Sequence, residues 1–323
     1  MREPSLHTRQ SGVGIDLASL IALRQEAGRL QIAPRGKVLA TRSGGHLSRF
    51  RGRGMEFDES RVYQPGDDPR NMDWRVTARS TVEHVKLFRE ERERPVWLLV
   101  DIGPGMRFGT RVAFKSVVAA QAAALLAWAA VDKGDRVGGV VFNEQRRVEY
   151  RPAAHTRSLL PLLNGLTELT AARDGPVPLP APRSGFGSLP AAAAHLVNLV
   201  RPGSLVFLIS DFAGLGSGDG AWMARLAAGS EMVLVQVYDA LEASAPPAGR
   251  YPVTDGSGRF VVDTADSGLR RHWAERFADH AAMLQQLCLR YQAHLISLRT
   301  DQAVGEVLRE GLRPHGRRSG GIR

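Results

Sequence analysis

Cysteine and long apolar runs are scarce in this chain of 323 residues. The single cysteine, Cys288, excludes an intramolecular disulfide framework and any metal site built only from cysteines. The longest apolar run, residues 117–131, is interrupted by Gln121 and is shorter than the ~20 residues of a membrane-spanning helix. Residues 1–14 lack the apolar core of a signal peptide. We therefore expect a cytoplasmic protein without membrane insertion.

Lysine is also rare, although the formal net charge is +10. Only Lys37, Lys86, Lys115 and Lys133 are lysines among the 43 basic residues. Much of the arginine alternates with acids, which neutralises it locally, and an Arg, Ala and Gly bias reflects coding composition as readily as a binding surface. We do not expect nucleic acid as a partner. The alternative of an arginine-rich tail (residues 309–323) that binds nucleic acid stays open.

Several motifs of enzymes are missing. The sequence has no Gly-x-x-x-x-Gly-Lys-Ser/Thr loop, no His-Glu-x-x-His pair and no Gly-x-Ser-x-Gly turn. These absences argue against nucleotide hydrolysis, a zinc peptidase and a serine hydrolase.

The chain divides into four predicted parts. Residues 1–35 form an arm and a helix (15–30), and residues 36–94 form a β-rich segment with a short extended piece (37–41) and strands at 55–63 and 82–90. Residues 95–300 alternate strands with helices, which predicts an α/β domain with a doubly wound, mostly parallel sheet. Residues 301–323 are predicted to be a basic tail. The strands of the α/β domain are expected at 96–102, 136–142, 147–150, 204–210, 232–237, 259–262 and 294–298, and its helices at 112–131, 155–169, 189–200, 220–228 and 269–291.

Two of the predicted strands end in aspartate. An apolar run of strand length leads into Asp101, and Ile209-Ser210 leads into Asp211. Open parallel sheets bind ligands beyond the carboxyl ends of their strands, so the two carboxylates share one crevice if these strands are neighbours. Such a pair suits Mg²⁺, a cationic side chain or the backbone amides of a loop, and the sequence leaves these three alternatives open.

The region from Pro95 onward resembles the von Willebrand factor A-type fold, whose metal site opens with Asp-x-Ser-x-Ser after the first strand. Here the aligned residues are Asp101, Gly103 and Gly105, so both hydroxyls are missing. A glycine, Gly187, also stands where the family usually has a threonine, and Asp211 matches the last acidic position. The resemblance therefore implies a degenerate metal site of Asp101 and Asp211. We expect no cofactor, since Mg²⁺ would keep most of its waters and bind weakly. The residues expected to line the crevice are Gly103, Gly105, Gly187 and Ser188.

A longer match lies upstream. Residues 52–75, GRGMEFDESRVYQPGDDPRNMDWR, followed by Thr77-Ala78-Arg79, resemble the signature of the bacterial family called domain of unknown function 58. Together with the A-type region the resemblance covers residues 36–298. Members of this family are typically encoded beside AAA ATPases of the MoxR type, and no enzymatic activity is established for them. The resemblance implies an adaptor or assembly factor that works with such an ATPase on an unidentified client protein.

The signature supports two interpretations. In the first, acids accept from Arg70, Arg75 and Arg79 in an ion-pair network that fixes the turn, and Trp74 packs against the sheet. In the second, the turn is a docking surface, because arginine and tryptophan are typical anchors of interfaces. We favour the first for Asp73 and Trp74. We favour the second for Asp67, Asp68 and Arg70. The full set of candidate partner-binding residues is Asp67, Asp68, Arg70, Asp73, Trp74 and Arg75.

The sequence therefore predicts a non-catalytic protein-interaction module. The alternative is a metal-dependent hydrolase or nuclease that uses Asp101 and Asp211, or the cluster of Asp67, Asp68 and Asp73. The interleaved arginines argue against this alternative, because they neutralise the acids that a metal would need.

Overall fold

The computed structural model describes residues 12–32, 55–65, 67–80, 82–90, 94–171, 187–216, 220–254 and 258–313. The chain forms two compact units, a large one of residues 1–39 and 94–323 and a small one of residues 40–93. The sequence alone places the corresponding boundaries at 36 and 94. The predicted extended piece at 37–41 and the last ten residues of the predicted tail fall outside the described residues.

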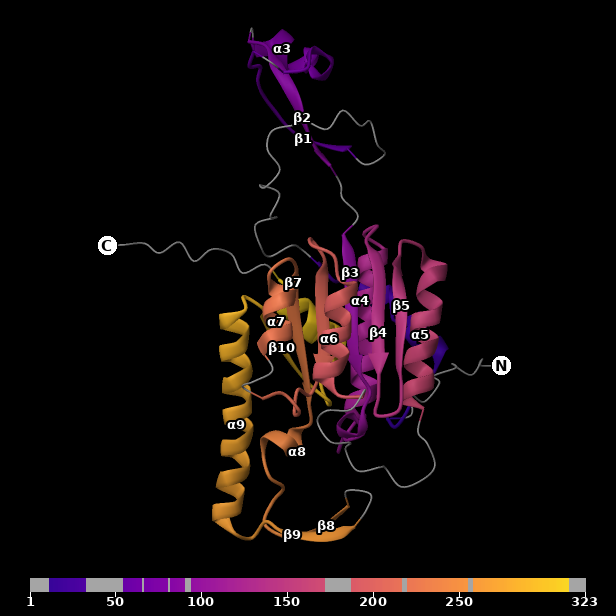
Figure 1. The fold of residues 1–323 in the computed structure, drawn as a ribbon, viewed down its shortest axis with the longest axis vertical. Coiled ribbons are helices and arrows are strands. Elements are labelled where there is room, and N and C mark those ends of the chain that lie inside the picture. The colour runs from indigo at the N-terminus through magenta and orange to yellow at the C-terminus, as the bar shows by residue number, and fades with distance from the viewer. Residues whose placement is uncertain are drawn as a thin grey trace, which may run out of the picture. The chain divides into compact units, whose positions relative to one another are not determined.

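The large unit is built on a six-stranded sheet, ordered β10-β7-β6-β3-β4-β5 (Figure 1). Neighbouring strands are parallel except β4 and β5, which are antiparallel. The prediction of an α/β fold with a mostly parallel sheet is confirmed. The strands are β3 (Pro95–Asp101), β4 (Arg136–Phe142), β5 (Arg147–Ala153), β6 (Leu205–Ser210), β7 (Glu231–Tyr238) and β10 (His294–Arg299).

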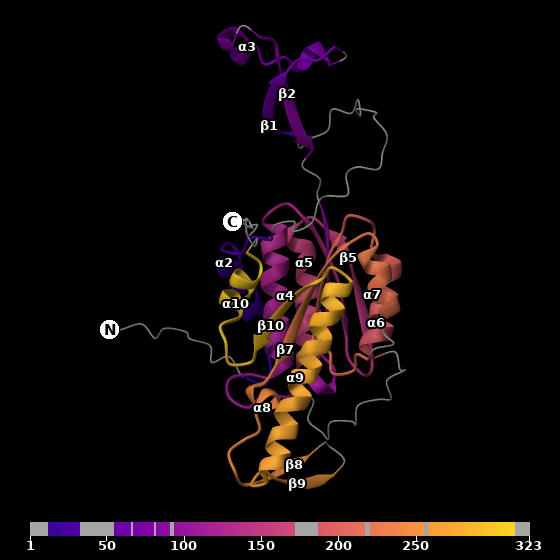
Figure 2. The ribbon, with the colours of Figure 1, turned by 90° about the vertical axis from the view of Figure 1, so that its left-hand side faces the viewer.

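Helices cover both faces of this sheet (Figure 2). One face packs on α4 (Lys115–Val131), α5 (Thr156–Thr170) and α10 (Val304–Gly311), together with the short helices α1 (Leu17–Ala22) and α2 (Arg24–Ala27). The other face packs on α6 (Leu189–Leu199), α7 (Gly220–Ala227) and α9 (Ser267–Arg290).

The central strand shows why its sequence has no polar alternation. Leu98 and Val100 of β3 belong to one apolar core, whereas Trp97 and Leu99 belong to the core on the opposite face. A strand that is buried on both faces reads as a continuous apolar run, as expected for a parallel sheet between two helical layers.

The structure differs from the sequence prediction at several short elements. The predicted helix at 15–30 is two helices, α1 and α2, which are separated at Leu23. Helix α10 lies within the predicted tail and buries Leu308. Val304 and Leu308 are four positions apart, so both lie on the face of this helix that packs on the sheet and α4. Beyond the carboxyl edge of the sheet, the chain forms α8 (Ala240–Ala243) and a hairpin of β8 (Arg250–Thr254) and β9 (Arg259–Asp263), of which only β9 is predicted.

The small unit is an antiparallel pair, β1 (Met55–Val62) and β2 (His84–Glu90). A 3-10 turn, η1 (Pro69–Asn71), and helix α3 (Trp74–Ser80) lie between the two strands. Helix α3 is not predicted from the sequence, because its seven residues are mostly polar and carry no apolar periodicity.

Across the described parts of the chain, every helix is too short or too polar to span a lipid bilayer.

Candidate functional site

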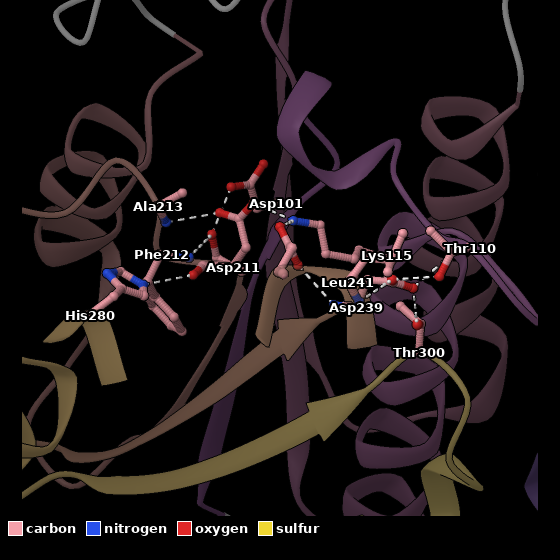
Figure 3. Close-up of polar contacts among 12 residues, drawn as sticks. Asp101, Thr110, Lys115, Asp211, Phe212, Ala213, Asp239, Leu241, His280 and Thr300 are labelled. Atoms are coloured by element: carbon pink, nitrogen blue, oxygen red, sulfur yellow. Dashed lines mark hydrogen bonds and ion pairs between the residues drawn. The ribbon is translucent and has the colours of Figure 1, made fainter. Parts of the chain in front are cut away.

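Asp101 and Asp211 lie at the same edge of the sheet, on neighbouring strands (Figure 3). Strand β3 pairs with β6 so that Val100 is opposite Ile209, which brings Asp101 level with Ser210 and places Asp211 one residue further along the same edge. The parallel pairing of the two strands therefore brings both carboxylates to one edge, called the crevice below, as the sequence predicts.

A lysine lies against one of these carboxylates. The Nζ atom of Lys115, the first residue of α4, lies 2.8 Å from Oδ2 of Asp211 and 2.6 Å from Oε1 of Glu242 on α8. Its side chain is only 2% exposed. Burial lowers the pKa of Lys115, but the two carboxylates outweigh burial and raise it overall, so the amine is charged. Of the three occupants that the sequence leaves open, the structure contains two: the cationic side chain of Lys115 against Asp211, and loop backbone amides that donate to Asp101 and Asp211.

Glycines allow the carboxylates to sit this close to the loop that follows β3. A Cβ atom added at Gly103 would lie 3.0 Å from Oδ1 of Asp101, and one added at Gly105 would lie 3.0 Å from Oδ2 of Asp211. Larger residues at these positions would push on the carboxylates. Gly103 and Gly105 therefore lie directly against the two carboxylates, and their lack of a side chain is part of the packing there.

The environment of Asp101 perturbs this carboxyl strongly. Its Oδ1 accepts from the Gly103 backbone N–H at 2.8 Å, and its Oδ2 accepts from the Ser210 hydroxyl at 2.7 Å. Burial and the nearby Asp211 nevertheless raise the pKa of Asp101 to about 7. Three carboxylates share one lysine here, so the crevice favours a proton on Asp101.

Backbone geometry fixes Asp211. Its Oδ1 accepts from the Ala213 N–H at 2.9 Å, and its carbonyl oxygen lies 3.2 Å from Nε2 of His280 on α9. The next residue, Phe212, has φ of 56°, a left-handed conformation that costs a bulky residue free energy. Phe212 is fully buried, and this packing holds the turn in place.

These residues do not fit a magnesium site. Mg²⁺ needs six oxygen ligands in octahedral geometry, whereas a charged amine lies against Asp211, and the glycines beside the two carboxylates offer no side-chain oxygen. Among the residues that the structure describes, no group of three or more His, Cys, Asp or Glu side chains is arranged to hold a metal ion.

A buried carboxylate, Asp239, links Lys115 to neighbouring parts of the same edge through Glu242. Asp239 follows β7, is fully buried and accepts from the hydroxyls of Thr110 and Thr300, each at 2.6 Å, and from the Leu241 N–H at 2.9 Å. Burial raises the pKa of Asp239, but these hydrogen bonds outweigh it and lower the pKa overall. The Asp239 N–H in turn donates to Glu242 and completes a capping box on α8, so Glu242 is held in place against Lys115.

Gly187 and Ser188 serve the neighbouring loop instead. The Ser188 hydroxyl caps α6 by accepting from Ala191 N–H at 3.4 Å. Gly187 packs so closely that an added Cβ would lie 2.4 Å from the carbonyl oxygen of Asn143. These contacts differ from the prediction that both residues line the crevice. Ser188 caps α6, and Gly187 packs on the turn after β4.

In the small unit, the acids of the signature bind locally. Asp67 accepts from Arg61 at 2.7 Å and from the Gln64 N–H, and both interactions lower its pKa. Asp68 caps η1. Asp73 is buried, accepts from the Ser60 hydroxyl at 2.7 Å and caps α3 through the amides of its first turn.

The predicted network of these acids with Arg70, Arg75 and Arg79 is wrong. Short acidic side chains at the start of a helix are within reach of the backbone amides, which outcompete distant guanidinium groups. The predicted packing role of Trp74 is also wrong, because this side chain is 69% exposed at the first position of α3. Asp73 does hold the turn, but through the Ser60 hydroxyl and backbone amides in place of the predicted arginines.

Sequence reasoning missed four residues of the crevice and its edge: Lys115, Ser210, Asp239 and Glu242. A signal for Lys115 was present, because it is one of four lysines and the only charged residue of an otherwise apolar helix. Asp239 follows an apolar strand just as Asp101 and Asp211 do. Glu242 could not be found, since its role depends on where α8 places it.

Comparisons with known proteins identify one family, several relatives and two similar structures. Residues 59–283 match the family described as Protein of unknown function DUF58. The chain is 33% identical over 280 residues to uncharacterised proteins of Mycobacterium tuberculosis and Mycobacterium bovis, which covers 84% of this chain and 83% of each relative. Two solved structures are similar at 14% identity over 68% of this chain. They are the conserved hypothetical protein BatB of Bacteroides thetaiotaomicron (TM-score 0.40, 97% of that chain) and an aerotolerance-related membrane protein of Bacteroides fragilis (TM-score 0.41, 98% of that chain).

Proposed function

The chain belongs to the DUF58 family of proteins of unknown function, and we propose that it is a non-catalytic protein-interaction module that works with a MoxR-type AAA ATPase. In this proposal the module is cytoplasmic and acts as an adaptor or assembly factor for a client protein. The partner comes from the family resemblance of the signature, and the structure supports the non-catalytic part.

One observation carries the proposal, namely the contact of Lys115 with Asp211 and Glu242. Metal-assisted hydrolysis needs an ion with an open coordination position for water. The lysine takes the place at the sheet edge where such an ion would neutralise the carboxylates. In this proposal the carboxyl edge of the sheet has a structural role, and partner proteins bind at other surfaces.

We further propose that the large unit is a divergent von Willebrand factor A-type domain. The parallel sheet with one antiparallel edge strand supports this, as does an aspartate at the end of the central strand with glycines two and four positions later. In this proposal Lys115 has replaced the ion of the family's metal site.

The direct test is association of the purified full-length chain with the purified ATPase encoded beside its gene. We expect the two proteins to elute together in size-exclusion chromatography. This association should need no Mg²⁺ beyond the amount that the ATPase itself requires. Failure of the two proteins to associate, with and without nucleotide, contradicts the proposed function.

The alternative, a metal-dependent nuclease or hydrolase, has a separate test. The chain is incubated with single- and double-stranded DNA and with RNA in Mg²⁺ or Mn²⁺, beside the variant Asp101→Asn. We expect no cleavage by either protein. Cleavage that depends on metal and is lost in the variant would replace the proposed function with this alternative.

A further inference from the structure

The signature exposes one tryptophan and three arginines, namely Trp74, Arg75 and Arg79 on α3 and Arg70 on the preceding η1. We infer that these four side chains, called the Trp74 strip below, dock on a protein surface that has acidic side chains around an apolar pocket. The inference rests on the proposed function, since it names the surface through which the module binds and the chemistry of its partner.

The arrangement on α3 separates an inner face from an outer face. Thr77 accepts from the His84 N–H of β2 at 3.0 Å, and Asp73 caps the helix from the buried side. Trp74, Arg75 and Arg79 are exposed, and positions 75 and 79 are one helical turn apart on the same side. The cap and the inner face fix the helix, so the outer face is presented on an ordered support.

The charges of this outer face have no partner in the part of the chain that the structure describes. Among the described residues, no hydrogen bond or ion pair is made by the guanidinium groups of Arg70, Arg75 and Arg79, because the nearby acids are used by Arg61, Ser60 and backbone amides. Like charges one turn apart weaken a short helix by a few tenths of a kcal/mol. A partner with carboxylates would remove this repulsion and would pair with the arginines in the bidentate geometry that they favour.

Trp74 supplies the apolar part of the strip. Its indole is 69% exposed, so a pocket that encloses it would remove a large apolar surface from water. Tryptophan and arginine are the residue types most enriched among the anchors of protein interfaces. A nucleic acid fits less well, because Asp68 and Glu83 are exposed in the same turn region and would lie against phosphates.

The test is site-specific photo-crosslinking in the native host, with a benzophenone amino acid in place of Trp74 in the full-length chain. The exposed position tolerates this aromatic replacement. The control carries the same group in place of Leu289, which is 81% exposed on α9. Adducts are cut with protease, and the crosslinked peptide is identified by mass spectrometry. We expect an adduct at position 74, absent at 289, on a peptide with acidic and apolar residues.

Charge reversal then tests the arginines. We expect Arg75→Glu with Arg79→Glu to lower the yield of the adduct at least about tenfold, as loss of anchor residues does. The matched control reverses two exposed arginines of α9, Arg271→Glu with Arg276→Glu, and is expected to leave the yield unchanged. Circular dichroism and the melting temperature verify that each variant folds.

The outcomes separate this inference from the proposed function. An adduct on an acidic peptide of the ATPase supports both, and one on an acidic peptide of another protein supports the strip but contradicts the proposed partner. The inference is overturned by an adduct on nucleic acid, by yields no higher than at position 289, or by insensitivity to the double charge reversal. It is also overturned if the ATPase binds the chain and crosslinks elsewhere.

Discussion

At the scale of single residues, Lys115 is the group on which the carboxyl edge depends. Its side chain is 2% exposed, and its removal leaves Asp211 and Glu242 facing each other without a cation. We expect Lys115→Met, which keeps the length of the side chain, to lower the free energy of unfolding by about 3 kcal/mol. Urea denaturation followed by circular dichroism measures this loss. The control Lys133→Met, at an exposed position just after the same helix, should change stability by less than about 0.5 kcal/mol.

The raised pKa of Asp101 predicts a pH dependence. The folded carboxyl has a pKa of about 7, whereas the ordinary value is 3.8, so the folded state holds a proton that the unfolded state releases between these values. The contribution of Asp101 to stability therefore falls as the pH rises from about 4 to about 7 and is constant above that. Asn at this position can keep the hydrogen bonds to Gly103 and Ser210 without a charge.

We expect Asp101→Asn to be increasingly stable relative to the wild type over this pH interval, by up to a few kcal/mol at pH 8. Denaturation curves at pH 4, 5, 6, 7 and 8 give the difference directly. A difference that does not change with pH would mean that Asp101 is ionised in the folded protein throughout.

At the scale of elements, helix α10 is the clearest departure from the sequence prediction. Leu308 is fully buried in the core that the helix shares with the sheet and α4. We expect Leu308→Ala to lower the free energy of unfolding by about 3 kcal/mol through the lost burial and the cavity left behind. Glu310→Ala, at an exposed position of the same helix, is the control and should have little effect. Equal effects of the two substitutions would show that α10 does not dock.

At the scale of the whole molecule, the two units differ greatly in how many side chains they bury. Among the small unit's described side chains only Asp73 and Val85 are buried, whereas the large unit has two extensive apolar cores. We expect the small unit to open at a lower free energy than the large one, so that unfolding of the chain is not two-state.

Hydrogen exchange followed by mass spectrometry tests this expectation. Backbone amides of β1 and β2 should exchange much faster than those of β3 and β6 at pH 7. Val85→Ala should accelerate exchange in β1 and β2 only, and Lys115→Met should affect the large unit. Exchange of both units at a single common rate would contradict independent opening.

The sequence by itself determined the layered α/β fold, because uninterrupted apolar strands such as β3 can be satisfied only between two helical layers. It also placed Asp101 and Asp211 at one edge, since both end parallel strands, and it identified the DUF58 family through a long signature. Short elements such as α3 and α10 escaped prediction, because a few turns of helix carry too little periodicity to recognise.

Only the tertiary structure decided which cation Asp211 meets and which signature residues face outward. Lys115 is 96 residues from Asp211 and 127 from Glu242 along the chain, and no local pattern reports such contacts. Similarly, the sequence offers several arginines as partners for the acids near Trp74. In the folded turn, backbone amides lie within reach of Asp68 and Asp73 and donate to them in place of the guanidinium groups of these arginines. Charge pairing depends on distances of a few ångströms, and those distances are set by the packing of the whole molecule.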